Sequence, residues 1–204
     1  MASTLQRSTI LPGRSALHGL AATIRHNPNG GEPGLVFCEM AHIGKLNIRA
    51  DKSAEKIIKT ATGCVFPPTA NKFTTAGERH VVWLGPDEFM IICEAGKDEE
   101  LASAINASFG SHHAAVTDIT DALAAFKLKG AAVRQVLAKG CALDLHQSSF
   151  ASGDAAQTLL SQAAVTIMAL ADDEFFIICR TSFAPYLHDW LLDAALEYGV
   201  KFVK

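Results

Sequence analysis

The chain has 204 residues, of which 49% are hydrophobic, so it can bury a sizeable core as one domain or as two small fused halves. Its 18 basic and 21 acidic residues give a net charge of −3 without any basic run, which argues against nucleic-acid binding. No apolar run approaches the roughly 20 residues of a membrane span, and the N-terminus does not resemble a secretory signal. We therefore expect a cytoplasmic protein that meets neither nucleic acid nor a membrane.

The sequence contains an odd number of cysteines, and none of them is spaced as C-x-x-C. They are Cys38, Cys64, Cys93, Cys141 and Cys179. Several lie in apolar, strand-like runs, such as the Ile-Ile-Cys that ends at Cys93 and again at Cys179. This pattern indicates buried, reduced thiols, which suits the cytosol.

Residues 1–34 differ from the rest of the chain, because glycine and proline crowd the run 27–34. Such punctuation predicts an extended arm followed by a loop. The arm also carries apolar residues without a clear place in the rest of the sequence, namely Leu5, Ile10, Leu11, Leu17 and Leu20. We hypothesise that the arm becomes ordered on a partner; the alternative is that it packs back on its own chain.

The first half then alternates between strand-like and helix-like patterns. Strands are predicted at 35–38 and 45–49, and the apolar spacing of residues 53–61 predicts a helix that stops at Gly63. Two apolar runs around Gly85-Pro86 predict a hairpin of residues 81–84 and 89–93. A helix at 98–108 and a strand at 114–117 complete this half.

The second half follows the same order. It predicts a strand at 125–129, a short helix at 131–139, strands at 164–168 and 174–179, and a helix at 182–198 that is the longest of all. The repeat is also visible in letters, because DEFMIIC at 87–93 and DEFFIIC at 173–179 agree at six of seven positions. Gly63-Cys64 corresponds in the same way to Gly140-Cys141.

An internal repeat determines the architecture. Each copy reads strand–helix–strand–strand–helix–strand, the split βαβ of ferredoxin-like units. The sequence thus predicts an α+β fold in which two tandem units form one compact domain. The expected divisions are residues 1–34 for the arm, 35–120 for the first repeat and 121–204 for the second.

Residues that could carry chemistry have simpler interpretations. The acid pairs at 87–88 and 173–174 lie at hairpin turns in both copies, which favours a structural turn over acid–base catalysis. His112-His113 would face opposite sides of a strand, and Cys141 with His146 is only half of a zinc site. Gly130 before a helix is far weaker than G-x-G-x-x-G. We therefore assign no catalytic, cofactor-binding or metal residue.

Several segments carry a family resemblance. They are residues 126–146, which read FKLKGAAVRQVLAKGCALDLH, residues 152–160 and 182–195, the WLGPDEF at 83–89, and Arg14 to Leu17. Together they resemble the sarcosine oxidase gamma subunit family over about residues 14–199, most strongly after Thr120. Small residues such as Ala142 depart from the family pattern without affecting a functional motif.

The resemblance implies an aminomethyltransferase-like fold and membership of a four-chain bacterial oxidase. That assembly oxidises sarcosine to glycine, with hydrogen peroxide and either formaldehyde or 5,10-methylenetetrahydrofolate as products. It implies alpha, beta and delta subunits as partners, with FAD, FMN and NAD in the alpha and beta chains, zinc in the delta chain, and no cofactor in this chain.

Two main functions remain open at this point. The first is a non-catalytic assembly subunit of the oxidase. The second is a stand-alone folate-binding protein of one-carbon transfer, although such proteins usually add a C-terminal barrel domain and this sequence ends at Lys204. A less specific third is a ligand-binding module. Flavoprotein genes beside this one, or co-purification with their products, would separate these possibilities.

Overall fold

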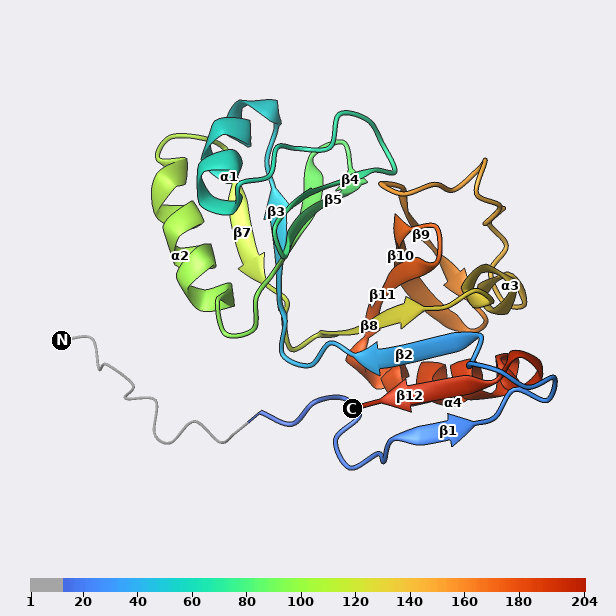
Figure 1. Cartoon of the computed structure of the whole chain (residues 1–204). Coiled ribbons are helices and arrows are strands. Elements are labelled where there is room, and N and C mark those ends of the chain that lie inside the picture. The colour runs from blue at the N-terminus through green and yellow to red at the C-terminus, as the bar shows by residue number, and fades with distance from the viewer. Residues whose placement is uncertain (1–12) are drawn as a thin grey trace.

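The computed structural model describes residues 13–204, which form a seven-stranded and a five-stranded sheet with helices on their outer faces (Figure 1). Leu5, Ile10 and Leu11 of the arm lie outside the described residues. The elements of the first part are β1 (Thr23–Arg25), β2 (Leu35–Glu39), β3 (Gly44–Arg49), α1 (Glu55–Thr62), β4 (Phe73–Ala76), β5 (Arg79–Gly85), β6 (Glu88–Cys93), α2 (Asp98–Phe109) and β7 (Ala115–Asp118). The second part comprises β8 (Leu123–Lys129), α3 (Val133–Ala138), β9 (Ala155–Leu160), β10 (Ala163–Ala171), β11 (Glu174–Arg180), α4 (Ala184–Ala194) and β12 (Val200–Val203).

The predicted α+β repeat is confirmed by the order of the strands. The five-stranded sheet runs β4-β5-β6-β3-β7, and the seven-stranded sheet contains β8-β11-β10-β9 in the equivalent arrangement. The hairpins that turn at Asp87 and Asp173 therefore occupy equivalent places. The sequence pattern missed β4 and β9, because these short edge strands are half exposed and lack a clear alternation of apolar residues.

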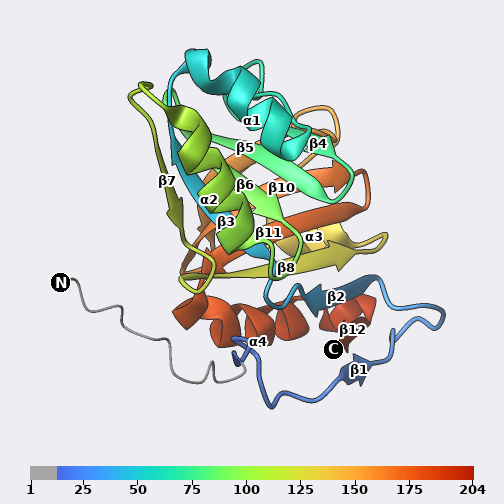
Figure 2. The same cartoon turned by 90° about the vertical axis from the view of Figure 1, so that its left-hand side faces the viewer.

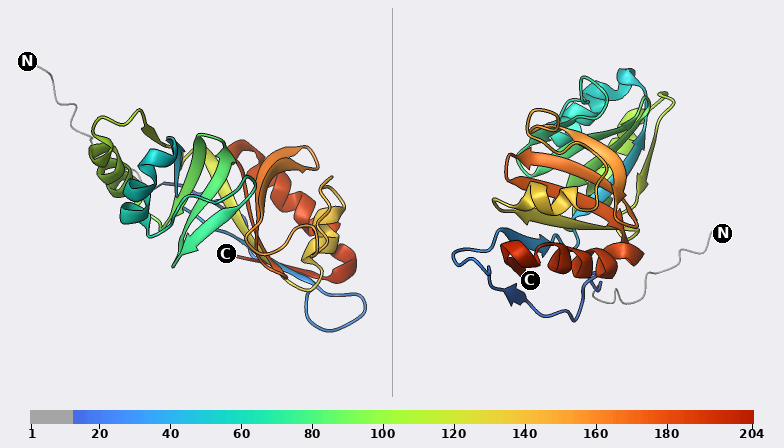
Figure 3. Two further views of the ribbon diagram at one scale, coloured as in Figure 1. Left: turned by 90° about the horizontal axis from the view of Figure 1, so that it is seen from above. Right: turned by 90° about the vertical axis from the view of Figure 1, so that its right-hand side faces the viewer.

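The two sheets pack face to face, so the molecule has four layers: helices, sheet, sheet, helices (Figure 3). In β6, Phe89 and Ile91 join the core beneath α1 and α2, whereas Met90 and Ile92 join the core between the sheets. Strand β11 repeats this division with its own alternating residues. A strand that is covered on both faces is apolar throughout, which explains the unbroken apolar runs of the two copies.

Local signals set the helix ends. Asp51 caps the 3-10 turn that opens α1, accepting a hydrogen bond from the backbone of Ser53 at 2.8 Å, and Gly63 ends α1 with φ of 80°. The helix predicted at 182–198 is instead three pieces, with α4 flanked by the 3-10 turns Thr181–Phe183 and Leu196–Tyr198. At 11 residues α4 is shorter than the 12-residue α2, so it is not the longest helix.

Strand β2 corrects the expected division of the chain. It was predicted to open the first repeat, but it lies in the seven-stranded sheet, parallel to β12 and antiparallel to β8. Strand β1 extends the same sheet by pairing with β12 (Figure 2). The apolar pattern of β2 predicted a strand at 35–38, but a pattern within one segment does not identify the strand with which that segment pairs.

The described part of the arm packs on its own chain, in line with the alternative and not with the hypothesis of partner-dependent ordering. Leu17 is only 3% exposed within the core of the second repeat. Its backbone N–H donates to both carboxylate oxygens of Glu39 at 3.3 Å. Leu20 packs against the same core.

Two further observations concern the cysteines and the question of a membrane-spanning helix. Cys93 and Cys179 are buried and free of disulfides, as predicted, with exposures of 1% and 2%. Within residues 13–204, none of the helices has the length and apolar character needed to cross a bilayer.

Candidate functional site

The glutamates of the acid pairs at the two hairpin turns form ion pairs with a neighbouring strand. Glu88 stands opposite Arg49 in the register of β3 and β6, and their charged groups lie 2.9 Å apart. Glu174 stands opposite Lys129 at the equivalent position of the second repeat, and it pairs more closely with Lys127 at 2.7 Å. The hydrogen bond from Lys127 lowers the pKa of Glu174. Each glutamate thus ties its hairpin to the neighbouring strand as a carboxylate.

The histidines and Cys141 do not gather into a metal site. His112 is exposed and bonds Ser53 at 3.0 Å, and the Nδ1 of His146 bonds the hydroxyl of Ser148 at 2.8 Å. Cys141 and His146 both line a shallow hollow beside α3, where the carboxylate of Asp144 accepts hydrogen bonds from the backbone N–H of His146 and the hydroxyl of Ser149. Among residues 13–204 there is no cluster of three or more His, Cys, Asp or Glu side chains suited to a metal ion.

Gly130 has a packing role. Its φ is +144°, and a Cβ at this position would collide with the carbonyl oxygen of Gly34, just before β2. That carbonyl accepts the backbone N–H of Ala132 at 2.9 Å. The strand-to-helix turn that superficially suggested phosphate binding is therefore occupied by the chain itself.

A candidate for binding is a hollow of about 460 Å³ that is lined by both sheets, here called the inter-sheet hollow. Its apolar wall comes from both sheets and from the segment that links them, with Met40, Ile43, Ile92, Leu170 and Phe176. Its polar residues include His80, Lys127 and Glu94. Sequence reasoning did not find this hollow, because its residues come from separated strands that only the fold brings together.

The polar groups in the hollow are poorly suited to catalysis. Burial lowers the pKa of His80, and the positive charge of Lys127 lowers it further, so the imidazole is neutral at pH 7. Its Nδ1 bonds the hydroxyl of Thr75 at 2.9 Å. Burial raises the pKa of the Cys93 thiol to about 11, so this wall residue is protonated and unreactive.

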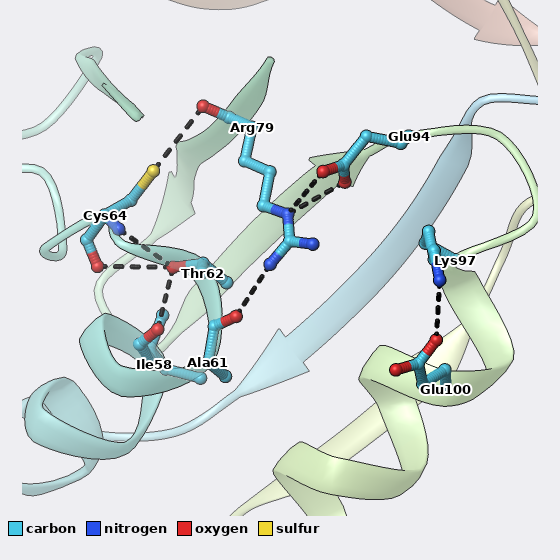
Figure 4. Close-up of polar contacts among 8 residues, drawn as sticks. All are labelled: Ile58, Ala61, Thr62, Cys64, Arg79, Glu94, Lys97 and Glu100. Carbon is cyan, nitrogen blue, oxygen red and sulfur yellow. Dashed lines mark hydrogen bonds and ion pairs between the residues drawn. The ribbon is translucent and has the colours of Figure 1, made fainter. Parts of the chain in front are cut away.

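The rim of the hollow is held by an arginine clamp (Figure 4). The Nε of Arg79 donates to both oxygens of Glu94 at 2.8 and 3.1 Å, and its NH1 donates to the carbonyl of Ala61 at 2.8 Å. The clamp connects the start of β5 to the end of α1 and to the residue after β6. Glu94 is consequently engaged within the chain, and its pKa is lowered by the hydrogen bond from Arg79.

A buried lysine was missed at the sequence level. Lys45 is 2% exposed, and its Nζ donates to the carbonyl of Ile43 at 2.7 Å. Burial lowers its pKa, which the nearby carboxylates of Asp121 and Asp98 partly oppose. A lysine on a strand that alternates between apolar and polar residues suggests a solvent-facing position, and only the tertiary packing shows otherwise.

Comparison with known proteins identifies relatives of this chain by sequence. Residues 48–197 match the model of the sarcosine oxidase, gamma subunit family. The chain is 30% identical over 201 residues to the sarcosine oxidase subunit gamma of Corynebacterium sp. (strain U-96), covering 96% of each chain. It is 29% identical over 200 residues to the subunit gamma of Arthrobacter sp., covering 97% of this chain and 96% of that one.

Solved structures agree. A chain of the heterotetrameric sarcosine oxidase from Corynebacterium sp. U-96 matches with a TM-score of 0.76 and 28% identity, covering 83% of this chain and 87% of that one. The glycine cleavage system aminomethyltransferase T from Bartonella henselae shares the fold, with a TM-score of 0.62 and 14% identity, and this chain covers 48% of it. The chain described here belongs to the sarcosine oxidase gamma subunit family.

Proposed function

We propose that this chain is the non-catalytic gamma subunit of a heterotetrameric sarcosine oxidase and that it works by assembly. The observation that carries the proposal is the combination of family membership with an inter-sheet hollow that holds a neutral imidazole and a protonated thiol. The sarcosine oxidase of Corynebacterium sp. U-96, one of whose chains this chain resembles in structure, is a heterotetramer, which supports the same assignment. Chemistry would then belong to the other subunits.

In this proposal the partners are alpha, beta and delta subunits, and the alpha and beta subunits hold FAD, FMN and NAD. The assembly converts sarcosine to glycine with hydrogen peroxide and either formaldehyde or 5,10-methylenetetrahydrofolate as products. We place the assembly in the cytoplasm, since all five cysteines of this chain are unpaired thiols, as suits a reducing compartment.

The test is co-expression with tagged alpha, beta and delta subunits, beside the same three subunits without this chain. We expect the chain to co-purify, and we expect its omission to lower the yield or thermal stability of the oxidase. The isolated chain should be colourless above 350 nm and should release no peroxide from sarcosine. Bound flavin or peroxide release by the isolated chain would contradict a non-catalytic role.

The second candidate is a folate-binding protein of one-carbon transfer, which the fold shared with aminomethyltransferase T favours. Calorimetric titration of the isolated chain with tetrahydrofolate distinguishes the two. Saturable binding in the micromolar range would support this candidate, whereas the assembly role predicts no heat beyond dilution.

A further inference from the structure

The seven-stranded sheet is wider than the sheet that packs on it. Among the described residues, the fully buried layer between the sheets draws from the wider sheet on β8, β9, β10 and β11, through Ala125, Ala155, Met168, Phe176 and Ile178. Strands β2, β12 and β1 continue the same face beyond that layer. In Figure 1, α4 lies behind β2 and β12, and none of the drawn helices or strands lies in front of them.

The residues on this continuation follow from the strand registers, because directly paired residues share a face. Lys201 stands opposite both Val36 and Ile24, and Val203 stands opposite Cys38. Together they make what we call the uncovered face: Ile24, Val36, Cys38, Lys201 and Val203. Ile24 is 52% exposed, and the others are partly exposed.

The alternate residues of the same strands point the other way. Phe37 and Phe202 pack beneath α4 with exposures of 1% and 2%, and their rings lie 5.1 Å apart. The two faces of β2 and β12 are therefore both largely apolar, although only one of them is covered. A strand with this composition is typical of a sheet that is buried on both sides.

The five-stranded sheet offers a comparison within the same molecule. Its β3 and β7 also extend beyond the layer between the sheets, and on that side they present the polar Asn47, Arg49 and Thr117 beside the small Ala115. Asn47 and Arg49 both bond Glu88, at 2.7 and 2.9 Å. This extension is polar, as a surface in water should be. The uncovered face has aliphatic side chains at the corresponding places, and exposed apolar patches mark interaction sites.

Charge indicates what the occupant carries. Lys127 and Lys129 continue the uncovered face on β8, where they stand opposite Cys38 and Val36. Both pair with Glu174, and Lys201 adds a third lysine to this part of the surface, whereas the hollow contains Glu78 and the arginine-bound Glu94. Lys127 also lines the inter-sheet hollow, which makes the face and the hollow one continuous surface. Burying the lysine-bearing part of this surface requires a partner that supplies negative charge there.

We propose that the uncovered face and the inter-sheet hollow together dock another subunit of the oxidase, through a segment that presents apolar side chains bordered by carboxylates. The inference rests on the proposed function, since it takes the partner from the same assembly. The apolar side chains of the partner fill the hollow and cover Ile24 and Val203. Its carboxylates approach Lys129 and Lys201.

A matched pair of substitutions tests the surface in the co-expressed oxidase. Ile24→Glu places a charge on the uncovered face at β1. Leu159→Glu is the control, because it places the same charge on β9, at the opposite edge of the sheet and outside the uncovered face. The two side chains are similarly exposed, at 52% and 57%. We expect Ile24→Glu to reduce co-purification with the partner subunits at least tenfold, and Leu159→Glu to leave it unchanged. Circular dichroism of each isolated variant checks that both remain folded.

The outcomes separate the docking surface from the proposed function. If the wild-type chain fails to co-purify, the proposed function is wrong and the docking surface falls with it. If the wild type and Ile24→Glu co-purify equally, or if Leu159→Glu alone abolishes co-purification, only the docking surface is overturned.

Lysine labelling gives a second measurement that needs no substitution. Lys129 and Lys97 are both ion-paired and similarly exposed, at 63% and 53% of their side chains, but Lys97 lies at the start of α2. Brief acetylation followed by mass spectrometry should show Lys129 protected at least threefold in the oxidase relative to the isolated chain, with Lys97 unchanged. Equal labelling of Lys129 in both states would contradict the proposal.

Discussion

The two repeats share the same strand order but differ in what lies beside their first strand, which is β3 in the first repeat and β8 in the second. In the first repeat β7 pairs directly with β3 and closes the sheet. In the second repeat β2 inserts between β8 and β12, and β1 is added outside β12. Both added strands come from the N-terminal part of the chain. The comparison teaches that the same unit becomes a wider sheet, with an uncovered face, when it accepts strands from outside the repeat.

The largest expected effect comes from removing the side chain that anchors the inserted strand. Phe37 of β2 is 1% exposed and packs against Phe202 of β12 and His188 of α4. We expect Phe37→Ala to lower the free energy of unfolding by about 3–5 kcal/mol, the usual cost of truncating a buried phenylalanine. Urea denaturation followed by circular dichroism measures it. A loss below about 1 kcal/mol would mean that β2 is a loosely attached strand.

A second prediction uses the equivalent turns after β3 and β8. The backbone N–H of Ala50 donates to Asp87 at 3.0 Å, and that of Gly130 donates to Asp173 at 2.9 Å. Only at the second turn does another segment of the chain lie close to the backbone, because the carbonyl group of Gly34 packs against Gly130. We expect Gly130→Ala to cost about 2 kcal/mol or more through strain and the clash. Ala50→Gly, the reverse change in the first repeat, should cost about 1 kcal/mol or less. Equal losses would remove the asymmetry between the turns.

The third prediction concerns pH and the first repeat. His80 has a lowered pKa in the folded chain, so the unfolded chain binds more protons between that value and the ordinary 6.5. Stability from this group is therefore complete above pH 6.5 and falls as the pH drops below it. Its counterpart in the second repeat, Thr166, does not titrate. We expect His80→Gln to flatten the dependence of the unfolding free energy between pH 6.5 and 5, measured by urea titration. An unchanged slope would contradict this assignment.

The smallest effect is expected at the ion pairs that brace the two hairpins. Arg49 and Lys129 are both more than half exposed, at 54% and 63% of their side chains. Solvent screens such pairs, so Arg49→Ala and Lys129→Ala should each cost less than about 1 kcal/mol. Thermal denaturation of each isolated variant measures its loss of stability relative to the wild-type chain. A loss of several kcal/mol from either variant would show that the braces matter more than the core.

Features formed within one segment of the chain could be predicted from the sequence, whereas features formed by distant segments could not. The repeat, the hairpins and the burial of Cys93 and Cys179 were predicted correctly, because DEFMIIC and DEFFIIC combine turn residues with unbroken apolar runs. The burial expected for Cys38 was wrong, since this thiol is partly exposed on β2. The pairing of β2 with β8 and β12 could not be predicted, since a strand's composition does not encode its neighbour. The same holds for the candidate site. Its hollow and its buried Lys45 depend on contacts between segments that lie far apart in the sequence.

Hydrogen exchange tests most directly whether the widened sheet of the second repeat is the docking side. Deuterium uptake would be measured by mass spectrometry in the isolated chain and in the assembled oxidase, for peptides that cover β1 and β12, β9, and β7. We expect assembly to slow exchange in β1 and β12 at least tenfold while β9 and β7 stay unchanged. Slower exchange in β9 or β7 with none in β1 and β12 would contradict the central claim.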